Sequence, residues 1–375
     1  MKFVATADWQ LGMSAHFLPV EARSRYQQAR FDAVARIGEI AASRGAEFVV
    51  VCGDVFESNQ LGRAVVSRAA EALRGFTVPV VLLPGNHDPL DAASIYDSAL
   101  FAARMPSHVH VIRDATPVEV VPGAEVVGAP WFSKRPTADL VAAATAPLEA
   151  PPPGVVRVIA GHGALRCLNP DRDSLATIDD AGLARVIEDG RAHVAIVGDR
   201  HSTYRAHPAI WYPGTPEVTD RREDDPGNVL LVDATDSGVS VEKIRVGEWS
   251  FQVIRDELNC AGDVEALAQR LRDLPGKDRT ALWLALSGTL STAAKAQLDE
   301  VVEAASEVFA RVGHWARHTD LAVLPDGHDF ASLGLGGFAA DALSELSGLA
   351  SGEGEDAATA QDALGLLYRL VGGAR

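Results

Sequence analysis

Five short polar clusters recur along the chain, and each contains residue types that can bind divalent cations. They are Asp8-Trp9-Gln10, Gly53-Asp54-Val55-Phe56-Glu57, Gly85-Asn86-His87-Asp88, Gly161-His162-Gly163 and Gly198-Asp199-Arg200-His201. Carboxylate, amide and imidazole groups supply oxygen and nitrogen donors suited to first-row divalent metals. In the last four clusters a glycine precedes the candidate ligand, which allows a tight turn and a close backbone approach. The pattern indicates metal-assisted chemistry, and no cysteine belongs to it.

The surrounding pattern indicates an α/β scaffold, because several of these clusters directly follow a short apolar run typical of a buried strand. Strands are predicted at Lys2–Ala7, Phe48–Cys52, Val78–Leu83, Val109–Ile112, Val118–Val121, Val126–Ala129, Val155–Ala160, Val194–Val197, Val229–Val232 and Val239–Ile244. Amphipathic helices are predicted at Ser24–Ser43, with Gly45 as a stop signal, and at Gly62–Arg74. Strands that end on one edge would bring the five clusters together. We therefore predict an α/β domain over residues 1–246.

A second pattern of strands and helices begins after residue 246. Strands at Phe251–Ile254, Ala281–Leu286 and Leu321–Leu324 alternate with helices marked by Val264 to Leu274 and by Leu298 to Val312. This predicts a small βαβαβ domain over residues 247–325. Residues 326–375 form a tail rich in Gly, Ala and Ser, with a short amphipathic helix at Ala360–Val371. That helix is either a partner-docking segment or an ordinary tail helix.

Composition excludes some classes of protein and favours others. The 375 residues are 47% hydrophobic, but no apolar run is long enough to cross a membrane. The N-terminus is a strand and not a signal peptide, and Cys52, Cys167 and Cys260 are widely separated, so we expect a cytoplasmic protein with reduced thiols. The net charge of −17 argues against an autonomous, high-affinity DNA binder, although a partner could supply DNA affinity.

The ordered clusters resemble the motifs of the calcineurin-like metallophosphoesterases, which run D-x-H, G-D, G-N-H-[DE], G-H and G-H-x-H. The resemblance covers residues 1 to about 245. It implies a metallophosphoesterase β-sandwich flanked by helices. Within that superfamily, the GDVFE cluster, the YPGTPE stretch at Tyr212–Glu217 and the following small domain resemble the SbcD-type DNA-repair exonucleases, in which the small domain is a capping domain.

The resemblance implies two divalent metal ions, with manganese the usual metal of the family. Asp54 would bridge them. Asp8, His201 and position 10 would complete the first site, and Asn86, His162 and position 199 the second. His87 would be the catalytic histidine near the leaving oxygen, oriented by Asp88. A water activated by the two metals would attack the phosphodiester.

The chain departs from the family motifs at two positions. Gln10 replaces the histidine of D-x-H, and Asp199 replaces the first histidine of G-H-x-H. The ligand set then holds three carboxylates, from Asp8, Asp54 and Asp199, and an oxygen-rich set favours Mn²⁺ or Mg²⁺ over Zn²⁺. One interpretation is a retuned and active centre. The other is partial decay, in which the first metal binds poorly.

The favoured function is a metal-dependent DNA nuclease that acts in DNA repair or recombination, with Arg200 and Arg205 as candidate phosphate contacts. By resemblance, such proteins pair with an SMC-like ATPase. The sequence leaves open a homodimer, the polarity of digestion and the strand preference. A phosphoesterase for a small molecule or a phosphoprotein, and a non-catalytic DNA-processing subunit, remain alternatives.

Overall fold

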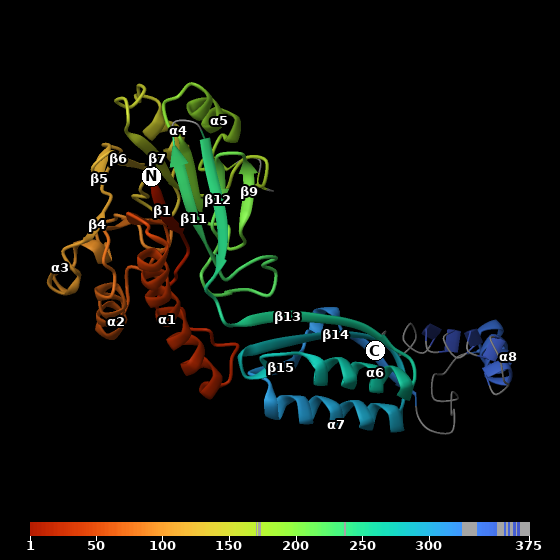
Figure 1. Cartoon of the computed structure of the whole chain (residues 1–375). Helices are drawn as coiled ribbons and strands as arrows, with labels where there is room; N and C mark the ends of the chain where they lie inside the picture. The colour runs from red at the N-terminus through yellow and green to blue at the C-terminus, as the bar shows by residue number, and fades with distance from the viewer. Residues whose placement is uncertain are drawn as a thin grey trace. The chain divides into compact units, whose positions relative to one another are not determined.

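The computed structural model describes residues 1–169, 171, 174–235, 238–324 and 336–350, together with residues 356, 357, 359, 360, 363, 364, 366 and 367. The chain divides into two compact units, Met1–Trp249 and Ser250–Arg375 (Figure 1). The predicted tail helix at Ala360–Val371 lies largely outside the described residues. No helix in the described ranges is long and apolar enough to cross a membrane.

The first unit contains two six-stranded sheets. The first has the order β12-β11-β1-β2-β3-β4, built from Gly238–Arg245, Asn228–Thr235, Lys2–Thr6, Phe48–Cys52, Val80–Leu83 and Val109–Val111. The second has the order β5-β6-β7-β8-β10-β9, built from Val118–Val121, Ala124–Gly128, Val156–His162, Val194–Gly198, Ile210–Tyr212 and Tyr204–His207. β1, β2 and β3 are parallel neighbours, as are β7 and β8.

The apolar strand runs are explained by burial on both faces. Every side chain of β2 is buried. Phe48, Val50 and Cys52 face an inner core shared with Val158 and Ile196 of the second sheet. The alternate residues of β2 pack on the opposite face of the first sheet, against α1 (Val20–Arg44) and α2 (Arg63–Arg74). Such strands therefore read as continuous apolar runs and not as alternating patterns.

Helices cover the outer faces of both sheets. The outer face of the second sheet packs against α4 (Leu140–Thr145) and α5 (Asp180–Glu188). The short helices η1 (Ile95–Asp97) and α3 (Ala99–Arg104) follow the third cluster. Gly45 ends α1 in the left-handed conformation, with φ 67°, as its position in the sequence predicted. The predicted fold of sheets flanked by helices is confirmed.

The described part of the second unit contains a four-stranded parallel sheet. Its strands are β13 (Ser250–Leu258), β14 (Thr280–Ser291), β15 (Arg311–His314) and β16 (Asp320–Leu324), and β14 pairs with the other three. Leucines of β14 pack against α6 (Ala261–Asp273) and α7 (Thr292–Val308). The described part of this unit also includes η2 (Lys277–Arg279), η3 (Ala316–His318) and α8 (Phe338–Ala350).

The sequence analysis was wrong about the end of α7. It extended the helical pattern to Val312, but α7 ends at Val308 and Phe309 leaves the helical region with ψ 152°. Val312 instead lies in β15, a strand that the analysis missed, and pairs with Leu282 of β14. Apolar side chains of α7 and of β15 pack in the same core, so hydrophobic spacing alone did not locate the boundary between the two elements.

Candidate metal centre

The five clusters meet where parallel strands of the two sheets end. Asp8 follows β1, Asp54 follows β2, and Asn86 and His87 follow β3 in the first sheet. In the second sheet His162 is the last residue of β7, and Asp199 and His201 follow β8. His162 pairs with Gly198, so the two ends lie side by side. Parallel strands share one carboxyl edge, which is the physical reason for the convergence.

The loops that carry the predicted ligands have an unusual backbone. Among the described residues, five non-glycine residues have positive φ, and four are Asp8 (54°), Gln10 (42°), Asp54 (52°) and Asp199 (87°). The conformation is costly for a residue with a Cβ atom, so the surrounding structure must enforce it. Hydrogen bonds from Asp8 N to Gly53 O (3.0 Å) and from Gln10 N to Asp54 O (2.8 Å) join the first two loops. Strain concentrated at these positions is typical of a functional site.

The glycines of the motifs leave space for the candidate ligands. A Cβ atom on Gly53 would lie 2.0 Å from His162 Nδ1, and one on Gly85 would lie 2.2 Å from Asp54 Oδ1. Gly53 also has φ 89°. The absence of a side chain at these positions therefore lets the imidazole and the carboxylate occupy the centre.

His162 is buried and surrounded by acceptor atoms. Its Nδ1 donates to Cys52 O at 2.9 Å, which directs Nε2 toward the centre. Nε2 lies 2.7 Å from Asn86 Oδ1, 3.4 Å from Asp54 Oδ1 and 3.8 Å from Asp199 Oδ1. Oxygen acceptors gathered around a ring nitrogen require a positive charge between them, either a proton or a metal ion. This group is the predicted second metal site.

Asp8 and Asp54 bring two buried carboxylates to the same place. Ligand atoms of Asp8, Asp54 and His162 all lie within 4.8 Å of one another. The Asp8 carboxylate accepts a hydrogen bond from Asp199 N at 2.9 Å, which ties the loops after β1 and β8 together. Uncompensated carboxylates at this depth are costly, and a divalent cation compensates them. The donors present therefore fit divalent metal ions.

The ionisation of these groups reflects burial and mutual attraction. Burial raises the pKa of Asp8 to about 6, although His201 and His162 act to lower it. Burial also acts to raise the pKa of Asp54, but His162 and His87 together hold it below its ordinary value. Burial opposes charge on His162, yet the Asp54 and Asp8 carboxylates raise its pKa well above the usual range. The centre thus attracts positive charge.

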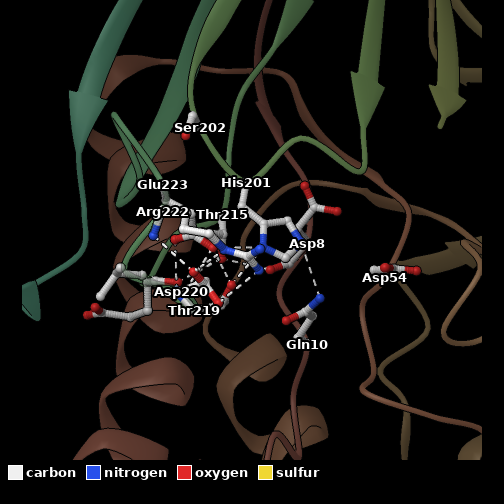
Figure 2. Close-up of polar contacts among 12 residues, drawn as sticks. Asp8, Gln10, Asp54, His201, Ser202, Thr215, Thr219, Asp220, Arg222 and Glu223 are labelled. Carbon is white, nitrogen blue, oxygen red and sulfur yellow. Dashed lines mark hydrogen bonds and ion pairs between the residues drawn. The ribbon is translucent and has the colours of Figure 1, made fainter. Parts of the chain in front are cut away.

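His201 and Gln10 form the other half of the centre (Figure 2). The Nδ1–H of His201 donates to Glu223 Oε1 at 2.8 Å and lies 2.6 Å from Thr219 Oγ1, and its Nε2 lies 3.3 Å from Gln10 Nε2. Burial disfavours charge on this ring, but the bond to Glu223 and the charge of Asp8 raise its pKa to about 9. A carboxylate behind an imidazole fixes its tautomer and orients Nε2.

The sequence analysis missed Glu223, which is the buried anchor of this half. Its carboxylate accepts hydrogen bonds from Thr219 N at 2.9 Å and Asp220 N at 3.1 Å, and also from the Thr219 hydroxyl. Its side chain is only 7% exposed. An acidic residue within the charged run Arg221-Arg222-Glu223-Asp224-Asp225 looks like part of a solvated face, and no local pattern distinguishes it.

His87 and Asp88 are adjacent in sequence but have different environments. The ring of His87 is half-buried, its Nδ1 lies 3.0 Å from Glu57 O and its Nε2 lies 3.9 Å from Asp54 Oδ2. Asp88 is fully buried and accepts hydrogen bonds from Gly85 N (2.8 Å), Phe56 N (2.9 Å) and the Tyr96 hydroxyl (2.6 Å). Burial raises the pKa of Asp88 to about 6. We predicted that Asp88 orients the His87 ring. In the structure Glu57 O holds that ring, and Asp88 instead braces the loop.

The two candidate phosphate contacts lie near the centre in sequence, and both stack on aromatic rings. The Arg200 guanidinium lies 4.9 Å from the Tyr204 ring centroid and 4.0 Å from Asp224 Oδ2. Arg205 is exposed, and its guanidinium lies 5.2 Å from the Trp211 ring centroid. Stacking orients both cations and leaves their N–H groups able to bind an anion.

Comparison with known proteins identifies the family. No curated protein matches the chain in sequence. Among solved structures, a dimetal phosphatase from Danio rerio aligns with a TM-score of 0.42 and 14% identity over 66% of this chain and 96% of its own. The TT1561 protein of Thermus thermophilus gives 0.39 and 11% over 65% and 98%, and the purple acid phosphatase PPD1 from yellow lupin gives 0.39 and 11% over 66% and 51%. The sequence profile of the calcineurin-like phosphoesterases matches residues 1–232, which is more than half of the chain. The protein therefore belongs to the calcineurin-like phosphoesterase family of metal-dependent hydrolases.

Proposed function

We propose that this protein is a DNA nuclease that hydrolyses phosphodiester bonds with two divalent metal ions, for which we expect Mn²⁺. The observation that carries the proposal is the environment of His162, whose Nε2 faces oxygen atoms of Asn86, Asp54 and Asp199. We expect Asp8, Gln10 and His201 to hold the other ion, with Asp54 as the candidate bridge between the two. The family match supports phosphoester hydrolysis.

The metal ions, when bound, would polarise the phosphoryl oxygens and supply a nucleophile near neutral pH. The protein's own residues then position the groups. Buried Asp8 and Asp54 provide negative charge, and the bonds of His162 to Cys52 O and of His201 to Glu223 aim both imidazoles inward. His87 keeps Nδ1 on Glu57 O, so its half-buried Nε2 is the atom that would exchange a proton with the leaving oxygen.

The choice of DNA as substrate is supported by the resemblance of the GDVFE cluster and the YPGTPE stretch to SbcD-type exonucleases. In the structure the YPGTPE stretch supports the centre. The Thr215 hydroxyl donates to Asp8 O at 2.8 Å, and the fully buried Glu217 accepts from Glu248 N at 2.8 Å and Trp249 N at 3.1 Å. Because the chain is acidic, we expect an SMC-like ATPase partner to provide much of the DNA affinity.

The test is Mn²⁺-dependent cleavage of end-labelled single- and double-stranded DNA, beside a simple phosphodiester and a simple phosphomonoester. We expect Asp54→Ala and Asn86→Ala to abolish cleavage and His87→Ala to reduce it by about 10²- to 10⁴-fold, the usual contribution of a general acid. Cleavage of the phosphomonoester alone would assign the protein to the phosphatases of the family. Cleavage of the simple phosphodiester but not of DNA would refute an autonomous nuclease.

A further inference from the structure

The β6–α4 loop, residues 129–139, begins with a tryptophan that is fixed beside the metal centre (Figure 1). Trp131 is buried, and its indole Nε1 donates to His162 O at 2.9 Å. Its ring meets the His162 ring edge to face, with 5.8 Å between the ring centroids. Its backbone N–H donates to Pro84 O at 3.1 Å, and its carbonyl accepts from Leu90 N at 2.8 Å. Trp131 therefore joins the end of β7 to the loop that follows β3.

The next residue in the loop has the opposite exposure. Phe132 is 54% exposed, whereas Trp131 is 7% exposed. No aromatic ring or cation stacks on Phe132 among the residues that the structure describes. Its phenyl ring therefore has a face that can stack on another planar group. Consecutive Cα atoms are about 3.8 Å apart, so the contacts of Trp131 with His162 hold Phe132 close to the centre.

Two positive charges follow in the same loop. Lys134 and Arg135 are exposed, and no carboxylate in the described ranges lies within ion-pair distance of either. The far end of the loop is fixed as well, because the Asp139 carboxylate accepts hydrogen bonds from two backbone N–H groups, each at 2.8 Å. β6 runs parallel to β7, so the loop lies at the carboxyl edge where His162 ends its strand.

An aromatic ring beside cations is the combination that binds a single strand of nucleic acid. The ring stacks on a base of any sequence, and the ammonium and guanidinium groups contact the neighbouring phosphates. Inorganic phosphate and phosphoserine have no planar group for the ring to stack on. A base within a duplex already stacks on both of its neighbours. The loop therefore fits an unpaired strand better than a duplex.

We propose that the β6–α4 loop binds a single strand of nucleic acid, with Phe132 stacked on a base next to the scissile phosphate and with Lys134 and Arg135 on the flanking phosphates. The inference deepens the nuclease function proposed above and rests on it, because it names the form of DNA that the centre receives. Phe132 touches the substrate but not the reacting atoms. Its contribution therefore applies to nucleic acid and is absent for a small phosphodiester that has no base.

The first experiment measures the binding of fluorescein-labelled oligodeoxythymidylate by fluorescence anisotropy. The full-length His87→Ala protein with Mn²⁺ serves as the background, because it keeps every candidate metal ligand and slows cleavage. In this background Phe132→Ala should weaken binding by about 5- to 100-fold, the usual effect of one stacked base. Phe132→Trp should retain the affinity. Phe338→Ala removes an 87% exposed phenyl ring from α8 and is the matched control, which should bind like the background protein.

The two cations are tested by the salt dependence of the same binding. Each phosphate contact to a single strand contributes about 0.7 to the slope of log K against log salt, so Arg135→Gln should reduce the slope by about that amount. Lys134→Gln should have the same effect. Arg104→Gln removes an exposed charge at the end of α3 and should leave the slope unchanged. Urea unfolding of these exposed-site variants should match that of the parent, which excludes misfolding.

Cleavage assays separate a contact with the substrate from an effect on the metal centre. With His87 present, Phe132→Ala should lower kcat/KM for the oligonucleotide by about 5- to 100-fold. It should leave kcat/KM for a small phosphodiester without aromatic groups within about twofold of the parent value. An equal loss on both substrates would overturn the inference, because Phe132 would then act on the centre. An equal loss of affinity for a blunt duplex would also overturn it.

The inference and the proposed function can fail separately. If Phe132→Ala binds the oligonucleotide like the parent, and the parent cleaves DNA, the nuclease stands and the role of the loop is refuted. If oligonucleotide binding depends on Phe132 but the parent cleaves no phosphodiester, the binding loop stands and the nuclease is refuted.

Discussion

Replacing Gly198 by alanine tests how the junction between the two sheets holds the centre. Gly198 ends β8 and pairs with His162. A Cβ atom at this position would lie 1.8 Å from Cys52 O, 2.7 Å from His162 Nδ1 and 3.0 Å from Ala7 Cβ. The added methyl group would therefore occupy the space of the hydrogen bond that orients His162.

The expected loss of stability depends on whether the atoms that the added methyl group meets can move away. Ordinary van der Waals contact begins at about 3.4 Å, so the shortest separation must grow by roughly 1.6 Å. Cys52 O belongs to the backbone of β2, which is paired on both sides by β1 and β3 and cannot rotate away. Overpacking of a core costs about 1–3 kcal/mol, and we expect the upper end of that range. Loss of the support behind His162 should weaken Mn²⁺ binding by about 10- to 100-fold.

The assay is urea unfolding of the metal-free protein, because bound metal would add its own free energy. A separate Mn²⁺ titration measures the affinity of the site that contains His162. Gly75→Ala is the matched control, since Gly75 has φ −73° and its Cβ would meet only Ala72 O at 3.9 Å. If Gly198→Ala unfolded and bound Mn²⁺ like Gly75→Ala, the account of the junction would be refuted.

Three further predictions concern the residues that support the centre. Glu223→Gln should weaken Mn²⁺ binding at the His201 site by about tenfold or more, measured by calorimetry, because it removes the charge that fixes the ring; unchanged binding would contradict this. Tyr96→Phe should lower the free energy of unfolding by about 1–3 kcal/mol in urea, because buried Asp88 loses a donor; a loss below about 0.5 kcal/mol would argue against the brace. Burial raises the pKa of Glu217, so the folded state binds its proton more tightly than the unfolded state. The stability that protonated Glu217 contributes is fully present below about pH 4.5, and it is lost as the pH rises through the pKa of Glu217 in the folded state. The difference in stability between the parent and Glu217→Gln should therefore fall over that pH range in urea unfolding, and a difference independent of pH would refute it.

Much of the scaffold could be predicted because its signals are local. The run Phe48–Cys52 was predicted with its observed bounds, since a strand buried on both faces must be apolar throughout. α2 was located to within one residue by its apolar period and the glycine after it. The short strands β9 and β10 and the short helices α3, α4 and α5 were missed, because elements of three to nine residues carry few periods of any pattern.

The sequence by itself determined which side chains could form the centre and that they would meet. Asp8, Asp54, Asn86, His162, Asp199 and His201 each lie at or just after a strand, and parallel strands end on one edge. Only the tertiary structure decided what each side chain contacts: Glu223 behind His201, Cys52 O behind His162, and Asp88 directed at Tyr96. These partners are separated by 22, 110 and 8 residues, respectively. Local spacing predicts the elements, whereas contacts over such separations depend on how the two sheets pack.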